Sequence, residues 1–389
     1  MNMEVSKHQA EKPPGNQKKC PQCGVVLSAV VLSGLCPNCL LKQGLKGPPA
    51  EGIETFEPPS LESLAKVMRG IFEPIEFIGR GGMGAVFKGR QYSLNRIVAL
   101  KVMQLRAADR GSIIQGFQRF KREARLLAQL SHRNVVGVYD FGLAGDFLYF
   151  TMEFVDGASL GQRLKSGPLL PSQAFELFLQ LCDGLQHAHQ SGVIHRDIKP
   201  ANLLVDKEGL LKIADFGLAK LAGASNEWKT LDGRQMGTLG YMALEQFEKP
   251  LEVDHRADIY AAGVVLYKML TGKLPAKVDS SLDEVLLRVL EKNVARRFQN
   301  IREFKQAVEA VQTMYRSDLE RQRQCLAKAL QETPGDVHVW EQLKQICDQL
   351  NDDEGSILAS RRLAGLYRRQ NRLASDLEER QGRELDEAA

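Results

Sequence analysis

The spacing of apolar residues changes once along this chain, and that change limits the fold more than any other feature. Strand-like segments, which alternate or run continuously apolar, come first, at 86–89, 97–102 and 148–152. Helix-like segments, in which apolar residues recur every three to four positions, follow at 171–189, 258–270, 282–290 and 301–314. A strand-rich half before a helix-rich half predicts an α+β fold with two lobes, which we place at 71–315.

Charge and hydrophobicity exclude two classes of protein. The 52 Lys and Arg residues against 48 Asp and Glu give a net charge of only +4, which is weak for a nucleic-acid binder. No apolar run approaches the roughly 20 residues that span a bilayer. The apolar stretch after Lys19 is broken at its start and lacks the cleavage site of a secretory signal. We therefore expect a cytoplasmic protein with no membrane span and no nucleic-acid partner.

Composition divides the rest of the chain into four further regions. Residues 1–18 are polar and predict a disordered tail, and 43–70 form a linker rich in proline and glycine. A compact cysteine-containing unit occupies 19–42. Residues 316–389 have helical periodicity and weakly resemble one tetratricopeptide helix pair, which is too little to call a repeat. The cysteine unit and the C-terminal helices are candidate sites for a protein partner.

Four of the seven cysteines form two C-P-x-C pairs separated by 12 residues: Cys20, Cys23, Cys36 and Cys39. Each pair can bind one edge of a metal ion, and two pairs complete the tetrahedron of four thiolates that Zn²⁺ favours. Two disulfides or a redox pair are the alternatives, and iron is the second candidate metal. We predict a zinc ribbon in which the metal is structural. The other three cysteines are expected to be buried packing residues: Cys182, Cys325 and Cys347.

A glycine-rich stretch predicts a phosphate-binding loop. Residues 79–86 read G-x-G-x-x-G-x-V, a pattern that dinucleotide-binding folds also use. In those folds the glycines begin a helix, whereas here they run into the strand-like residues 85–88. The backbone N–H groups of a hairpin would then contact phosphates. On the next strand Lys101 can reach the same phosphates, and Glu123 on the following helix can pair with Lys101.

Two further motifs identify the fold. Residues 195–202 read His-Arg-Asp-Ile-Lys-Pro-Ala-Asn, and 215–217 read Asp-Phe-Gly. With the glycine-rich loop and Val98-Ala99-Leu100-Lys101, they match the order of the protein kinase signature set. The stretch 71–315 thus resembles the bacterial Hanks-type serine/threonine protein kinases, which implies a β-rich N-terminal lobe and a helical C-terminal lobe.

The resemblance implies ATP and Mg²⁺ (or Mn²⁺) as cofactors and protein Ser or Thr hydroxyls as acceptors. Asp197 would accept the hydroxyl proton, Lys199 would steady the γ-phosphate, and Asn202 and Asp215 would hold the metal. Lys101 and Glu123 complete the implied catalytic set. The resemblance also implies a hydrophobic stack between the lobes, made by Leu127, His195 and Phe216. The implied nucleotide-binding residues are Ile78, Gly79, Arg80, Gly81, Gly82, Met83, Gly84, Val86, Ala99, Lys101, Met152, Glu153, Val155 and Asp156.

The sequence departs from the family in the substrate-binding region. Leu239 and Leu244 replace two prolines of the family pattern, and the connection from 270 to 282 is short. A catalytically weak scaffold that binds ATP and acts through its ends is therefore the alternative to an active kinase. Arg196 resembles the arginine that binds an activation-loop phosphate, for which Ser225 and Thr230 are the candidates. The resemblance also implies that Glu245 and Arg297 form a buried ion pair and that Asp258 anchors the catalytic loop.

Overall fold

The computed structural model describes residues 56–81, 84–104, 121, 124–216, 240–275 and 284–387, with side chains to residue 371. Almost all of them belong to the larger of two compact units, Pro58–Leu231 with Gln235–Ala389. The four cysteines of the predicted zinc ribbon lie outside the described residues. None of the helices in the described ranges is long and apolar enough to span a membrane.

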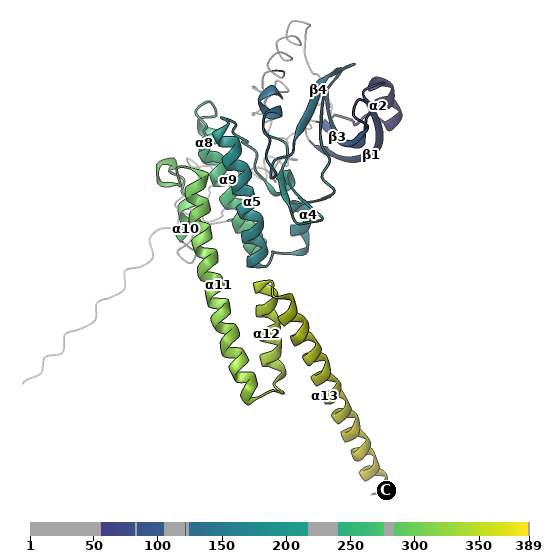
Figure 1. Ribbon diagram of the computed structural model, residues 1–389, viewed down its shortest axis with the longest axis vertical. Coiled ribbons are helices and arrows are strands. Elements are labelled where there is room, and N and C mark those ends of the chain that lie inside the picture. Colours follow the sequence, from purple (N-terminus) through teal and green to yellow (C-terminus); the bar gives the residue numbers. More distant parts are fainter. Residues whose placement is uncertain are drawn as a thin grey trace, which may run out of the picture. The chain divides into compact units, whose positions relative to one another are not determined.

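Five antiparallel strands form the sheet of the first lobe, in the order β1-β2-β3-β5-β4 (Figure 1). Their bounds are β1 (Phe72–Gly81), β2 (Gly84–Gln91), β3 (Arg96–Gln104), β4 (Val138–Ala144) and β5 (Phe147–Glu153). The central strands β3 and β5 are buried over most of their length, which explains their near-continuous apolar sequences. A short helix, α2 (Leu61–Val67), begins at Ser60, whose side chain accepts a hydrogen bond from the backbone N–H of Ser63, and contacts β1.

The second lobe is helical and its core lies between α5 (Pro171–Gln190) and α9 (Arg256–Thr271). Pro171 starts α5 at a position where its missing N–H costs no helical hydrogen bond. The rings of Phe178 and Phe304 meet edge to face, with centroids 5.0 Å apart. Within the described residues, this lobe also contains α4 (Leu160–Arg163), α8 (Leu244–Glu248), α10 (Glu284–Val289) and α11 (Ile301–Glu332).

A small three-stranded sheet, β6-β7-β8, lies at the start of the second lobe. Its strands are β6 (Gly157–Ser159), β7 (Leu203–Asp206) and β8 (Leu211–Ile213). The 3₁₀ turn Pro200–Asn202 leads directly into β7, and β8 ends two residues before Asp215. The sheet therefore fixes the segments on either side of the predicted catalytic motifs.

The last described residues form two more helices, α12 (Val337–Leu350) and α13 (Asp353–Glu387). Helix α11 runs without a break across position 315, where we expect the kinase domain to end. Asp336 caps the start of α12 by accepting the N–H of Val339, and Asn351 ends the helix in the left-handed conformation. Cys182 and Cys347 are buried as expected, but Cys325 is exposed, because it lies on the outer face of α11.

Candidate active site

The segment 195–202 is held in place by one buried carboxylate. Asp258, in the first turn of α9, accepts the backbone N–H groups of His195 at 2.8 Å and Arg196 at 2.7 Å. The ring of His189, near the end of α5, lies 2.9 Å from the same carboxylate. Burial alone would raise the pKa of Asp258, but these hydrogen bonds and nearby charges lower it below its ordinary value. This anchor matches the role that the sequence implies for Asp258.

His195 connects this segment to Ala214, the residue that follows β8. Its Nε2 lies 2.9 Å from the carbonyl oxygen of Ala214, and the backbone N–H of Asp197 donates to its Nδ1 at 3.2 Å. A carbonyl needs a donor and an N–H needs an acceptor, so the imidazole carries its proton on Nε2. Ala214 N–H also donates to the carbonyl of Asn202 at 2.8 Å. Two hydrogen bonds thus fix the segment that contains Asp197 next to the residue that precedes Asp215.

Two of the predicted catalytic side chains converge on Asp197. Its Oδ2 lies 2.8 Å from Lys199 Nζ, and the Asn202 amide donates to the same oxygen at 3.0 Å. The Asn202 amide also donates to the Asp197 carbonyl at 2.8 Å. The Asp197 side chain remains one-third exposed. An incoming hydroxyl can therefore reach this carboxylate, with a cation beside it.

Lys101 and Asp215 join the two lobes directly. Lys101 Nζ, on β3, lies 2.7 Å from Asp215 Oδ1. Burial alone would raise the pKa of Asp215, but the charge and hydrogen bond of Lys101, with smaller contributions from His195 and Lys199, lower it. Asp215 is ionised at neutral pH for this reason.

Two residues of the site adopt left-handed backbone conformations, Arg196 with φ 66° and Asp215 with φ 63°. Such conformations cost about 1–3 kcal/mol outside glycine and persist only where the surroundings impose them. The N–H of Arg196 is bound by Asp258, and its carbonyl accepts from the Gln246 side chain at 3.0 Å. Strain of this kind is typical of functional sites.

Asn202 and Asp215 offer the donor chemistry that Mg²⁺ prefers. Both hydrogen bonds of Asn202 to Asp197 use its NH₂ group, which leaves the amide oxygen for a metal. Asp215 supplies an ionised carboxylate. Within the described ranges no three His, Cys, Asp or Glu side chains could hold a metal by themselves. The residues present fit an ion that is bound by one or two protein oxygens together with substrate phosphates.

The predicted glycine-rich loop connects β1 to β2. Gly81 pairs with Gly84, so the connection is a two-residue hairpin whose residues, Gly82 and Met83, lie outside the described part of the chain. A Cβ atom on Gly84 would lie 2.1 Å from the carbonyl oxygen of Val102, so only glycine allows β2 to approach β3 here. Ile78, Gly79 and Arg80 belong to β1, and Val86 and Ala99 to β2 and β3. Glu123, the predicted partner of Lys101, is also outside the described residues.

The predicted hinge follows β5. Met152 is buried, and its neighbour Glu153 forms an ion pair with Lys212 on β8, with 2.9 Å between Nζ and Oε1. Asp156, which we expect near the ribose, forms an ion pair with the exposed Lys207. Lys207 lowers the pKa of this exposed carboxyl through a hydrogen bond. Lys212 and Lys207 could not be found from the sequence, because they lie 59 and 51 positions from their partners and no motif spacing connects them.

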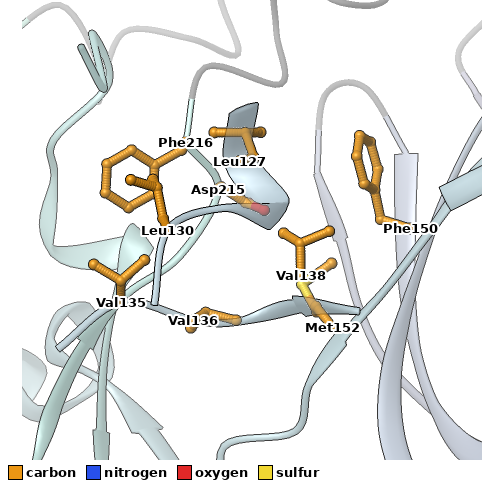
Figure 2. Close-up of a pocket in the computed structure, with 9 residues that line it drawn as sticks. All are labelled: Leu127, Leu130, Val135, Val136, Val138, Phe150, Met152, Asp215 and Phe216. Carbon is orange, nitrogen blue, oxygen red and sulfur yellow. The ribbon is translucent and has the colours of Figure 1, made fainter. Parts of the chain in front are cut away.

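A small apolar pocket lies behind Met152 (Figure 2). Its cavity of about 20 Å³ has room for roughly one water molecule, so it cannot be a nucleotide site. Leu127 and Phe216 both contribute to its wall, and the Phe216 ring lies 4.6 Å from the ring of His195. These contacts match the predicted hydrophobic stack. The lining residues are Leu127, Leu130, Val135, Val136, Val138, Phe150, Met152, Asp215 and Phe216.

The region beyond the catalytic segment contains the predicted buried ion pair. Arg297 is fully buried, and two of its guanidinium nitrogens contact Glu245 at 2.5 and 2.9 Å. Leu244 begins helix α8 and is exposed. Ser225, Thr230 and Leu239 lie outside the described residues.

Comparisons with known proteins agree with this geometry. The family model described as "Protein kinase domain" matches residues 72–347. The serine/threonine-protein kinase pkn3 of Myxococcus xanthus is 34% identical over 302 residues, which cover 68% of this chain and 53% of that protein. A probable serine/threonine-protein kinase of Clostridium perfringens is 38% identical over 232 residues, 59% of this chain and 33% of that protein. The aligned part of this chain spans only a third to about half of these two relatives.

A solved kinase structure is also similar to this chain. A double mutant of the PknI kinase domain of Mycobacterium tuberculosis aligns with a TM-score of 0.51 and 25% sequence identity, over 67% of this chain and 99% of that one. The family match covers most of the chain and includes every catalytic motif described above. The chain therefore belongs to the protein kinase family.

Proposed function

We propose that this protein is a serine/threonine protein kinase that transfers the γ-phosphoryl group of ATP to Ser or Thr hydroxyls of proteins, itself included. One observation carries the proposal. Lys199 and Asn202 both contact the Asp197 carboxylate, while Lys101 contacts Asp215. Phosphoryl transfer depends on positioning and on neutralising charge, and these residues supply both.

In the proposed reaction, the acceptor oxygen bonds to the γ-phosphorus as the bond to the β–γ bridging oxygen breaks, and ADP leaves. The hydroxyl proton passes to Asp197. Lys199 neutralises charge on the transferred group, and Lys101 holds Asp215 and can reach the α- and β-phosphates. Asn202 and Asp215 would hold Mg²⁺, which neutralises phosphate charge when bound. The nucleotide would lie beneath the β1–β2 hairpin, with its adenine against the backbone of Glu153 and Val155.

Serine or threonine specificity is supported by Lys199, which lies two positions after Asp197 as in kinases of this class, and by the printed names of the similar bacterial proteins. We propose that a phosphate on Thr230 or Ser225 regulates the enzyme. We propose that Arg196 binds this phosphate. Its guanidinium makes a weak hydrogen bond to the carbonyl of Val253, at 3.4 Å, and Arg196 is half-buried.

We further propose that Cys20, Cys23, Cys36 and Cys39 bind one structural Zn²⁺ and that the chain acts in the cytoplasm, where thiols stay reduced. The cysteine unit and the C-terminal helices would bind protein partners. Metal analysis of the purified chain should find one zinc per molecule, and a Cys36→Ser variant should lose it. A full complement of disulfides, measured by thiol titration without zinc, would refute this part.

The experiment that tests the kinase proposal is intact-mass spectrometry after incubation with Mg·ATP, with Asp197→Asn as the control. Mass gain in steps of one phosphate that the variant does not show would establish autophosphorylation, and peptide mapping would then distinguish Thr230 from Ser225. If neither protein gains mass or phosphorylates a generic Ser/Thr substrate, while both still bind ATP, the scaffold alternative stands. Leu239 and Leu244 would then be the first residues to replace with proline, the residue of the family pattern at both positions.

A further inference from the structure

Two histidine rings stack where the turn before β4 meets helix α5. The rings of His132, in that turn, and His187, on α5, have centroids 5.1 Å apart and planes inclined by 21°. Both residues are half-buried. Nε2 of His187 is buried and, among the described residues, has no hydrogen-bond partner. The two rings therefore do not share a proton through this nitrogen, and a positive charge on both would be repulsive.

The His132 ring also fixes the backbone of its own turn. Its Nδ1 accepts the backbone N–H of Asn134 at 3.1 Å. Only a neutral imidazole that carries its proton on Nε2 can accept a hydrogen bond there. The N–H of Val135 donates to the carbonyl of His132 at 3.0 Å and closes the same turn. The position of Asn134 thus depends on a ring that has no proton on Nδ1.

Asn134 in turn holds strand β8. It is buried, and its side-chain amide donates to the carbonyl of Leu211 at 2.8 Å. Its own carbonyl accepts the N–H of Ile213 at 2.9 Å, and the N–H of Val136 donates to the carbonyl of Ile213 at 2.9 Å. Ile213 is the last residue of β8 and lies two positions before Asp215. The turn that His132 fixes therefore supports the strand that leads into the candidate active site.

The surroundings of the His132 ring oppose a positive charge on it. The titratable side chains that face it come from α5, from β8 and from its own turn: His187, Asp183, Lys212 and Arg133. Burial first, and then His187, lower the pKa of His132 from its ordinary value of 6.5, and the two cations act in the same direction. Asp183 acts the other way, but Lys305 pairs with it at 2.5 Å. The ring is therefore neutral at pH 7 and gains its proton only in acid.

We propose that His132 is a pH-sensitive positioning residue: its neutral ring holds Asn134 against β8, and its protonation releases β8 and with it Asp215. A proton on Nδ1 removes the acceptor of the Asn134 N–H, so that two donors then face each other. The new charge also lies against the ring of His187. The turn must move to relieve both contacts, and the hydrogen bonds between Asn134 and β8 weaken with it. This inference goes beyond the proposed kinase function, and the release of β8 does not depend on that function.

The sign of the effect follows from the two states of the ring. A released ring returns towards its ordinary pKa, which is higher than that of the held ring. Protons therefore favour the released state, and the held state loses stability as the pH falls below about 6.5. Above that pH both states are neutral and the turn stays closed.

Hydrogen–deuterium exchange between about pH 5 and 8, followed by mass spectrometry, tests the proposal without reference to catalysis. The reporter is the peptide that contains β8, and its protection factor corrects for the pH dependence of intrinsic exchange. In the wild type this protection should fall several-fold towards the acid end, while α9 keeps its own. His132→Asn should show no such fall, because the asparagine Oδ1 can still accept the Asn134 N–H and does not titrate.

Two further variants give the opposite shift and a control. His187→Phe keeps a ring in the stack but removes one cause of the lowered pKa of His132, so the loss of protection should begin at a higher pH. His338→Asn removes an exposed histidine on α12 and should leave the curve unchanged. If His132→Asn lacks protection even at the alkaline end, His187→Phe alone decides the outcome.

Three results would overturn the proposal. The first is a wild-type β8 that keeps its protection over the whole range, and the second is a His187→Phe curve that does not move to higher pH. The third is a loss of protection in α9 at the same pH as in β8, because the whole lobe would then be unfolding rather than one strand being released. A folded His132→Asn protein that loses protection as the wild type does would likewise contradict the role of this ring.

Discussion

Lys212 and Glu153 form a half-buried ion pair that connects the hinge to the strand before Asp215. Lys212 Nζ lies 2.9 Å from Oε1 and 3.1 Å from Oε2 of Glu153. The backbone N–H of Gly137 is 3.4 Å from Oε2 and adds a third, weaker contact. The Glu153 N–H is itself bonded to the carbonyl of Gly137 at 2.8 Å. The side chain of this hinge residue is therefore fixed from the second lobe by Lys212, and its backbone by Gly137, the residue before β4.

Lys212→Met should loosen the hinge. The variant leaves the Glu153 carboxylate half-buried without its cation, which should reduce the free energy of unfolding by about 2 kcal/mol. We expect the KM for ATP to rise several-fold while kcat changes little, because the chemical groups stay in place. Lys207→Met is the matched control, since its pair with Asp156 is exposed on both sides and should contribute almost nothing. Equal effects of the two variants in urea unfolding would contradict this assignment.

Lys101→Met should move the pH range in which the metal binds. Burial alone raises the pKa of Asp215 and Lys101 opposes it, so without the lysine that pKa rises. The carboxyl then keeps its proton to a higher pH and cannot hold Mg²⁺ there. The acidic limit of Mg²⁺-dependent nucleotide binding, followed by fluorescence titration between about pH 4 and 7, should shift upward relative to wild type. A limit that stays unchanged would mean that Lys101 does not set the charge of Asp215.

The Glu245–Arg297 pair should contribute strongly to the stability of the helical lobe. Arg297 is fully buried and also donates to the backbone carbonyl of Glu291 at 2.6 Å. Removal of one partner leaves a buried charge unpaired, so Arg297→Met and Glu245→Gln should each cost about 3–5 kcal/mol in urea unfolding. The double variant should cost less than the sum of the two single variants. Strictly additive losses would show that the two side chains do not act as a pair.

Gly84→Ala should disturb the sheet rather than the chemistry. Its new methyl group would meet the carbonyl of Val102 at 2.1 Å, so β2 must move away from β3, and thermal unfolding should shift downward by several degrees. Gly79→Ala is the control, because an added Cβ there has nothing within 4 Å. Its unfolding temperature should stay close to that of the wild type. If both variants melted alike, the close contact at Gly84 would not be what requires glycine.

The spacing of apolar residues predicted most of the fold, because the strands and helices bury their side chains in a regular pattern along the chain. The helix expected at 171–189 is found at Pro171–Gln190, and the one expected at 258–270 at Arg256–Thr271. Asp197, Lys199 and Asn202 could be placed together in advance because they are neighbours in one short segment. Lys101 and Asp215 are 114 positions apart; the family resemblance placed both in the active site, but their direct contact was not predicted.

Other features left no signal in the sequence. The His189–Asp258 contact depends on how α5 and α9 pack, and periodicity does not specify which polar residues meet across two helices. The length of α11 was underestimated because the kinase domain was expected to end at 315, although no proline or glycine interrupts the chain between Ile301 and Glu332. The exposure of Cys325 follows from the same helix, since only a narrow face of α11 is covered there.

The unbroken α11 has a mechanical consequence. Its first turns pack in the core of the helical lobe through Phe304, and its later turns carry α12, with Tyr315 bonding to Gln349 at 2.8 Å. A continuous helix of 32 residues is a stiff rod about 48 Å long, with no joint at which its two ends could bend independently. A force applied to α12 would thus be transmitted to the lobe that holds Asp258 and the catalytic segment, and proteolysis within α11 would sever that transmission.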